Sequence, residues 1–560
     1  MLSGAEPDPG GEGRPEARDW LGLGVLLGFA GGLRAFAWHR TAVLFNDGPI
    51  FLALAQALRE GRFGDVLAHP QHPLYPALVA ALELLSVPSE AAAIVVSIAG
   101  GLLAVAAIFW MAWARFGRSV AWISAWTVAL HPWAVDFSAD VMSDGLYAGL
   151  HLAGFAVLIE LLERPTRGRA LAFGLLASLA YWTRPEGLVL VVVAVVGLLA
   201  RIGAARPEQR RRIAGPAVLV VIACLALAGA FVFAERQADG DLALSQKKSI
   251  AELAQGGPTA SEIARDRRER REILRDPHAL PLPESSIRVD GSGIDRPARS
   301  LAGFAEAFVR VVATSISAFR HELFVFALIG CIALAAQPRR ELRAFEAVLA
   351  GSLALHTALL VLLVWGAGYV SRRHALAAWL PLTLVAAVGW SVAWRALLEI
   401  VVARRFRRDR RGPETAATGI AEGLGGGRGA RVAVALAVVV LLVSWGPRDL
   451  RARRSDRALE RVAAEWLKAR GGPTAPVAAQ KRRTAYYAGA SFVPLPDGRD
   501  GRIERQIRGR GARWLVIDAA KLGDHAGLAE GIGRWLVPVH TVGAGLQSVL
   551  VLEVTPDPAS

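Results

Sequence analysis

The stretch "FNDGPIFLALAQALREGRFGDVLAHPQHPLYP", residues 45–76, decides which folds the chain can adopt. It directly follows an apolar run that is long enough to cross a membrane, yet it carries Asp47, Asp65, His69 and His72. Ionisable side chains are costly inside a bilayer, and proline restricts both itself and the residue before it. We therefore expect this stretch to lie at a membrane surface, beside the spans of a helical bundle.

The composition of the whole chain agrees with a membrane location. Of its 560 residues 53% are hydrophobic and only 20% are charged, and the mean hydropathy is +0.37. Apolar runs of roughly 15 to 25 residues recur, which is the length that a helix needs to cross about 30 Å of hydrocarbon. The sequence therefore predicts an all-α polytopic membrane bundle.

We expect about eleven transmembrane helices, because that many apolar runs can be counted. The segment 73–87 is left out, since it is short, contains Glu83 and begins at a proline; it fits a juxtamembrane or re-entrant helix better. The expected spans are 20–38, 91–113, 119–135, 145–162, 170–182, 187–201, 214–234, 322–336, 344–365, 374–395 and 431–446.

The arginine-rich loops fix the expected orientation. With eleven spans, all of them fall on the same side as the N-terminus, which is the cytoplasmic side by the positive-inside rule. These loops are 115–118, 163–169, 201–213, 337–342 and 403–413. The C-terminal part then lies outside the cell membrane. The Ala- and Arg-rich composition is typical of a bacterium with a GC-rich genome, which favours a multi-pass protein of the inner (plasma) membrane.

The pattern after about residue 447 changes from long apolar runs to alternating strands and helices. Strands are predicted around 476–480, 512–518 and 547–554, with helices at 457–472, 483–490 and 528–536, which indicates a small extracytoplasmic α/β domain. The expected organisation is a cytoplasmic tail 1–19, a transmembrane domain 20–446 and the α/β domain 447–560. Within the transmembrane domain we expect a first outer loop 39–90, an outer insert 235–320 and a cytoplasmic linker 403–430.

The formal net charge of +15 does not predict nucleic-acid binding. The basic residues collect in the short loops between spans, where they set orientation, and no motif that reads nucleic acid accompanies them. Cys224 and Cys331 both lie within apolar runs, so the sequence predicts no disulfide framework and no metal site built on CxxC.

Several polar residues are expected to meet at the outer face of the bundle: Asp47, Asp140, Asp144, Arg184, Arg372, Arg373 and His374. Such residues at a bilayer boundary are usually paired or functional. Each one also has an ordinary structural explanation. Arg184 and Arg373 could be snorkelling anchors, Asp144 could start a helix, and Asp47 in "NDGP" could belong to a plain turn. Their convergence is what favours a site.

Four motifs, in this order along nearly the whole chain, carry a resemblance to a known family. They are Asp47 with "ALAQALREGRF" (53–63), "HPLYPALVAAL" (72–82), "VMSDGLYAGLHLAGFAVL" (141–158), and "WTRPEGLVLVV" (182–192) with the late "YVSRRHALAAWLPL" (369–382). The sequence resembles the GT-C membrane glycosyltransferases, namely dolichyl-phosphate-mannose–protein mannosyltransferases and bacterial aminoarabinose and RgtA–D-like transferases. It departs from them at "NDG", where an Asp-Glu pair is commoner, and at His374, where Tyr is usual.

The resemblance implies a glycosyltransferase that moves a sugar from a polyprenyl-phosphate donor to an acceptor hydroxyl on a lipid, glycan or protein. Asp47 and Asp144 would be its catalytic residues, with Asp47 as general base and Asp144 orienting a sugar hydroxyl, an arginine or a metal. The residues expected to bind the substrate are His72, Tyr75, Asp140, Arg184, Tyr369, Arg372 and Arg373.

No cofactor is predicted with certainty. A divalent metal is possible, because His69 and His72 are three residues apart, but two histidines without a settled carboxylate partner are a weak ligand set. A transporter or flippase of lipid-linked sugars is the alternative function, since it too would need a helical bundle with buried charges. That class usually shows inverted repeats and interrupted spans, which the sequence does not display.

Overall fold

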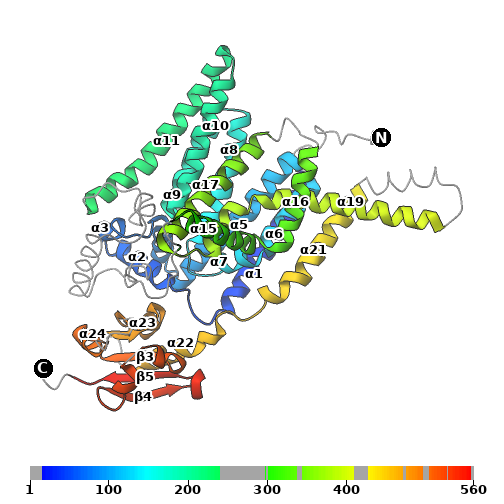
Figure 1. Ribbon diagram of the computed structural model, residues 1–560. Coiled ribbons are helices and arrows are strands. Elements are labelled where there is room, and N and C mark those ends of the chain that lie inside the picture. Colours follow the sequence, from blue (N-terminus) through cyan, green and yellow to red (C-terminus); the bar gives the residue numbers. More distant parts are fainter. Residues whose placement is uncertain are drawn as a thin grey trace.

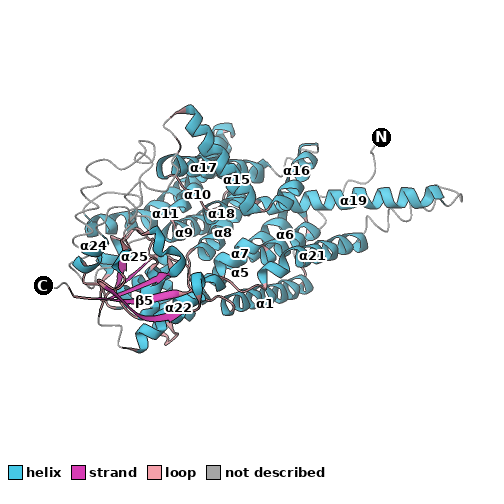
Figure 2. Cartoon of the chain, turned by 60° about the horizontal axis from the view of Figure 1, so that its bottom comes forward, coloured by secondary structure: helices cyan, strands magenta, loops and turns pink. Residues whose placement is uncertain are grey.

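The structure is a computed structural model that describes residues 15–239, 297, 300–336, 343–408, 427–470, 475–495, 503–525 and 527–556. It consists of a large helical part and a small sheet that lies at one end of it (Figure 1, Figure 2). Most of the cytoplasmic tail 1–19, most of the outer insert 235–320, the loop 337–342 and the centre of the linker 403–430 lie outside the described residues.

The helical part confirms a multi-pass membrane protein. Among the described residues, nine helices are long and apolar enough to cross a membrane, namely α1, α5, α8, α10, α11, α15, α17, α19 and α21. The expected number of eleven spans stays a prediction. The bounds are α1 (Ala17–His39), α2 (Gly48–Arg59), α3 (Phe63–Leu67), α4 (Leu74–Leu84), α5 (Ser89–Phe116), α6 (Arg118–Leu130), α7 (Pro132–Ser138), α8 (Asp144–Glu163), α9 (Arg167–Thr183), η1 (Pro185–Gly187), α10 (Leu188–Ala204), α11 (Pro207–Asp239), α15 (Leu301–Phe319), α16 (His321–Ala336), α17 (Arg343–Ala367), α18 (Arg372–Trp379), α19 (Leu382–Arg408) and α21 (Gly427–Asp449).

Two runs that the sequence analysis treated as single spans are each broken at a proline. The run 119–135 divides into α6 and α7 at His131–Pro132, and the run 374–395 divides into α18 and α19 at Pro381. Proline has no N–H to donate, which removes a helical hydrogen bond at each break. It also disfavours the helical conformation of the residue before it, and His131 is accordingly extended, whereas Leu380 keeps helical angles. The breaks leave α7 and α18 as short helices beside the start of α8, which they contact.

A third difference concerns the outer insert 235–320. Its last part forms α15, an apolar helix of 19 residues that the sequence analysis did not count among the spans. Buried Ala307 and Val311 of α15 pack with Val364 of α17 and Ala375 of α18. This helix therefore belongs to the helical part and supports α18.

The charged residues of the bundle gather at its two ends. At one end Arg118 pairs with Asp19 at 2.8 Å and Arg115 with Glu163 at 3.4 Å, so the basic loops after α5 and α8 lie there together. Because α8 runs from Asp144 to Glu163, Asp144 lies at the opposite end. The sequence pattern predicted this separation. Which end faces the cytoplasm stays a prediction.

Helices α5 and α8 pack through glycines. A Cβ atom at Gly149 would lie 2.3 Å from the carbonyl oxygen of Gly100, and one at Gly100 would lie 2.3 Å from the Cα atom of Leu146. Small residues at such a crossing let two helix backbones approach closely, which is how membrane helices associate without a hydrophobic driving force. The crossing holds the start of α8, and thus Asp144, against α5.

The C-terminal part carries one five-stranded sheet in the order β2-β1-β3-β5-β4. β1 is parallel to β2 and β3, whereas β5 is antiparallel to β3 and β4. The elements are η3 (Ser455–Arg457), α22 (Ala458–Ala469), β1 (Val477–Ala479), α23 (Arg482–Ala488), β2 (Phe492–Pro494), α24 (Ile503–Gly509), β3 (Trp514–Asp518), η5 (Ala519–Asp524), α25 (Leu528–Gly531), β4 (Leu536–Val542), η6 (Gly545–Gln547) and β5 (Val549–Val554). The predicted small sheet is confirmed, but the helix expected at 528–536 shortens to one turn and is followed by β4.

The sheet part and the helical part share an apolar core. One buried cluster joins Val43 and Leu44 after α1, Tyr75 of α4 and Val96 of α5 with Leu467 of α22 and further residues of the sheet part. In Figure 1, α22 and α23 lie between the strands and the helical part. The sheet part is therefore packed against the segment that leads from α1 to α2.

The glycine crossing gives a test of the fold. Gly149→Ala should lower stability by about 1–3 kcal/mol, because overpacking forces the α5 and α8 backbones apart. Thermal unfolding in detergent, followed by tryptophan fluorescence, measures the effect. Gly28→Ala in α1 is the matched control: a Cβ there meets nothing within 4 Å. Equal unfolding midpoints for the two variants would contradict the packing argument.

Candidate functional site

Asp47 lies directly before α2, where its backbone oxygen accepts hydrogen bonds from the amides of Ile50 and Phe51. Its side chain makes no capping hydrogen bond to the helix. Instead, Oδ2 accepts a hydrogen bond of 2.6 Å from Nη1 of Arg373. An aspartate that served only the turn would use its carboxylate locally. The carboxylate of Asp47 faces a residue far away in the sequence, and its side chain keeps 15% of its surface exposed.

Arg373 reaches Asp47 from the first turn of α18, which Ser371 and His374 cap. Burial lowers the pKa of Arg373, but the carboxylates of Asp47 and Asp144 offset that effect and raise the pKa above its ordinary value. The guanidinium stays fully charged as a result. Its Cζ atom also lies 5.3 Å from the ring centre of Phe45, in a cation–π contact.

The side chain of Arg372 makes different contacts from that of its neighbour Arg373. Its Nε donates a 2.9 Å hydrogen bond to Oγ of Ser317 in α15, and its guanidinium lies over the ring of Trp133 at 4.4 Å. These contacts connect α18 with α15 and α7 rather than with Asp47. Its position thus favours support of the helices over contact with a substrate.

Asp144 and Arg184 form a second, more deeply buried ion pair. Nη1 of Arg184 donates to Oδ1 of Asp144 at 2.6 Å, and both side chains are less than one tenth exposed. Arg184 also holds both oxygens of Glu186, at 3.0 and 3.3 Å. Its guanidinium lies 5.7 Å from the ring centre of Tyr147. Three carboxylate oxygens therefore occupy Arg184, whereas Arg373 is paired with one.

One member of each ion pair, Asp144 and Arg373, lines the same small, largely apolar cavity. Arg34 of α1 lines it as well and is fully buried. Its Nε donates to Oγ of Ser138 at 2.7 Å and its Nη1 to two backbone oxygens, while Nη2 has no hydrogen-bond partner. The sequence analysis missed Arg34, although a charged residue within the run 20–38 was a signal for function.

Three other predicted substrate-binding residues, His72, Tyr75 and Tyr369, are not among the residues that line this cavity. His72 is buried against Phe231, and its Nδ1 lies 2.6 Å from the backbone oxygen of Tyr181. The hydroxyl of buried Tyr75 contacts Ser97 and the oxygen of Ala93. Tyr369 is more than one third exposed and packs edge-on against His374. Tyr369 alone among the three presents an accessible side chain near α18.

Asp140 is committed to contacts with other parts of the chain. Its Oδ2 accepts a hydrogen bond from Nη2 of Arg454 at 2.5 Å, and its Oδ1 accepts from the amides of Val141 and Phe45. With 2% of its surface exposed, Asp140 fixes the loop before α8. Its predicted contact with a substrate remains untested.

The described residues contain no group of three or more His, Cys, Asp or Glu side chains placed to hold a metal ion. His69, the weak candidate ligand beside His72, is buried, and its Nδ1 accepts a hydrogen bond from the amide of Gln71 at 3.0 Å. The described part of the chain therefore offers no metal centre built from these side chains.

Comparisons with known proteins show which structures have a similar fold. No protein-family model and no curated protein sequence matches the chain. Two crystal structures of ArnT from Cupriavidus metallidurans do, one bound to undecaprenyl phosphate and one in the apo state. Their TM-score is 0.55, with 13% and 14% identity, and the match covers 96% of this chain and 98% of ArnT.

The oligosaccharyltransferase of Archaeoglobus fulgidus, in complex with zinc and sulfate, is similar as well. It has a TM-score of 0.52 and 12% identity over 92% of this chain and 72% of that protein. At identities this low, the TM-scores show a shared fold alone. The match to ArnT covers 96% of this chain, so it extends into the C-terminal sheet. The predicted fold is confirmed: the chain has the fold of the GT-C membrane glycosyltransferases.

Proposed function

We propose that the chain is a glycosyltransferase that moves a sugar from a polyprenyl-phosphate donor to an acceptor hydroxyl at the outer face of the cytoplasmic membrane. One observation carries the proposal: the carboxylates of Asp47 and Asp144 each face an arginine at 2.6 Å, and Asp144 and Arg373 line one cavity at the end of the bundle. ArnT, which shares this fold, is known with undecaprenyl phosphate bound, and that supports a lipid-linked donor.

Asp47 serves as the general base. As the acceptor oxygen attacks the anomeric carbon, its proton passes to the carboxylate of Asp47. The bond between the anomeric carbon and the donor phosphate breaks, and the phosphate oxygen keeps the electron pair. A positioned base of this kind contributes about 10²–10⁴ in rate. The partly exposed Asp47 is accessible to an acceptor that approaches from outside the bundle.

Arg373 stabilises the leaving phosphate. Arginine presents five donors in a planar fork that matches phosphate geometry. Arg373 uses Nη1 for Asp47, so other donors of the fork can bind the donor phosphate. A phosphate bound there also competes with Asp47 for the arginine, which frees the carboxylate oxygen that must accept the proton. Donor binding thus prepares the base.

Arg184 fits a different role from the phosphate contact that the sequence suggested for it. Three carboxylate oxygens already occupy its guanidinium, and Glu186 holds two of its nitrogen atoms. The ion pair therefore orients Asp144, which lines the cavity. The cavity of about 20 Å³ is too small for a sugar, so a hydrogen bond from a sugar hydroxyl to Asp144 requires the cavity to widen when the donor binds. Arg34 also lines this cavity, and its buried Nη2 has no hydrogen-bond partner, so Arg34 is a further candidate donor.

The first test replaces the base. Asp47→Asn keeps the shape of the side chain but cannot take up the proton, so sugar transfer should fall about 10²–10⁴-fold. The measurement is transfer from radiolabelled polyprenyl-phosphate sugars by membranes with matched amounts of protein. Asp65→Asn is the control, because Asp65 lies in the same outer loop, is exposed, and forms its ion pair with the nearby Arg62. Full activity in Asp47→Asn would leave a glycosyltransferase without this base.

The second test compares the two neighbouring arginines. Arg373→Ala removes a charged hydrogen-bond donor, worth roughly 1.5–3 kcal/mol, so kcat/KM for the donor should fall about 10- to 100-fold. Arg372→Ala should cost much less, because Arg372 contacts Ser317 and Trp133. Steady-state kinetics with varied donor concentration separate the two. Equal losses of kcat/KM in the two variants would refute the assignment of Arg373 to the donor phosphate. Transport of the donor without sugar transfer would favour the alternative function, a flippase.

A further inference from the structure

The segment between α1 and Asp47 is held by the C-terminal sheet part. The backbone of Arg453 pairs with it like a short strand, because its amide donates to the oxygen of Arg40 at 2.9 Å and its oxygen accepts from the amide of Ala42 at 3.1 Å. The next amide to point the same way, that of Leu44, donates to the hydroxyl of Tyr487 at 2.9 Å.

Arg454 connects this segment with the start of α8. Its Nε donates to the backbone oxygen of Val43 at 2.8 Å, and its Nη2 donates to Asp140, which accepts in turn from the amide of Phe45. The backbone of Arg454 has a φ of 49°, a left-handed conformation that costs energy for a residue other than glycine. The fold keeps this conformation, and through it Arg454 spans the segments that carry Asp47 and Asp144.

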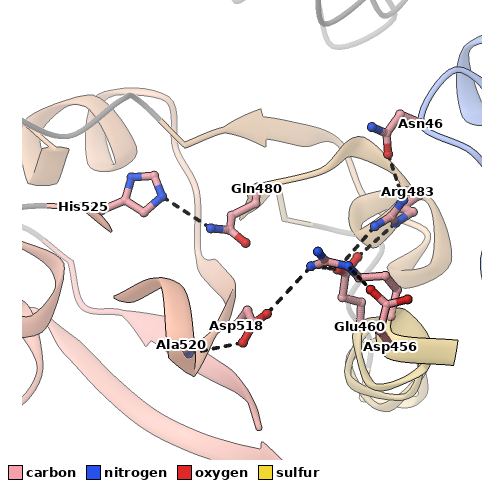
Figure 3. A network of polar contacts seen from close by, with 9 residues as sticks. Asn46, Asp456, Glu460, Gln480, Arg483, Asp518, Ala520 and His525 are labelled. Atoms are coloured by element: carbon pink, nitrogen blue, oxygen red, sulfur yellow. Dashed lines mark hydrogen bonds and ion pairs between the residues drawn. The ribbon is translucent and has the colours of Figure 1, made fainter. Parts of the chain in front are cut away.

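The last contact reaches the residue next to Asp47. Arg483 donates from Nη1 to Oδ1 of Asn46 at 2.9 Å (Figure 3). Glu460 of α22 holds the same guanidinium at 3.0 and 3.3 Å, and both side chains are about one tenth exposed. Glu460 also pairs with Arg457, which lies 3.7 Å from Asp518 at the end of β3. A hydrogen bond from Arg483 to Asn46, followed by a chain of ion pairs, thus connects Asn46 to the sheet.

We propose that the C-terminal sheet part positions the catalytic base, with Arg454, Arg483 and Tyr487 as positioning residues. They hold residues 40–46 in a fixed position relative to α18, the helix that carries Arg373. This inference rests on the proposed function of Asp47. The contacts fall on five residues of this short segment, whereas attachment of a domain alone could use any surface of the bundle. These residues are Arg40, Ala42, Val43, Leu44 and Asn46. A misplacement of about 1 Å can cost 10²-fold in rate, so the hold on this segment governs the chemistry.

The test uses the full-length protein and removes contacts by changing one residue of the segment and one residue of the sheet part. Asn46→Ala removes the acceptor of Arg483 but leaves the ion pair of Arg483 with Glu460 intact, and Tyr487→Phe removes one hydroxyl. Arg513→Ala is the control, because Arg513 lies in the same sheet part and its partner Glu553 is also exposed. We expect kcat to fall about 10- to 100-fold in the combined variant, with little change in KM for the donor.

Hydrogen exchange gives a second measurement that does not depend on activity. The amides of Ala42 and Leu44 should exchange faster in Asn46→Ala with Tyr487→Phe than in the wild type or Arg513→Ala. Unchanged exchange, or faster exchange with an unchanged kcat, overturns the positioning role. The failure of the proposed function looks different. If Asp47 is not the base, Asp47→Asn retains full transfer whatever the exchange of the segment, and if the chain is not a glycosyltransferase, the wild type itself transfers no sugar.

Discussion

The structure depends on one constraint, which is that a carboxylate at the edge of a bilayer must face a cation. Asp47, Asp136, Asp140 and Asp144 meet this constraint with arginines from other parts of the chain. Each pair joins two elements that the sequence keeps far apart, such as α2 with α18 and the loop before α8 with the sheet part. The charges at this end of the bundle therefore support its tertiary arrangement, and both Asp47 and Asp144 act electrostatically on Arg373.

The ion pairs differ in how much of each side chain they leave available for contact with a substrate. Arg184 is saturated by carboxylates, and Asp140 by Arg454 and two amides, so both hold structure. Asp47 and Arg373 face each other at the surface of the same arrangement, and each keeps part of its side chain exposed. A charge that is both restrained and accessible suits chemistry, because it costs little reorganisation when a substrate arrives. On the proposed function, this difference distinguishes the pair that takes part in the chemistry from the pairs that support the fold.

The sequence was sufficient for the features that follow from local pattern. Apolar run lengths gave the membrane bundle, and basic loops separated its ends. The pairing of the site residues could not be predicted from the sequence, since Asp47 and Arg373 are separated by 326 positions and no periodicity links them. Arg34 was overlooked because an apolar run with a single charge still reads as a span. β4 was missed because it lies at the sheet edge, is largely exposed and contains Pro538, which removes the signal of a buried strand.

The bond between Leu44 and Tyr487 spans 443 positions of the chain. A ribosome adds about 5–20 residues per second, so the segment before Asp47 waits on the order of 20–90 s for its partner to be synthesised. During that time the first helices are already in the membrane, while the loop that carries the proposed base lacks its contact with Tyr487. On the proposed function, a nascent chain is therefore inactive until the sheet part has been synthesised and folded, so the order of synthesis delays the onset of activity.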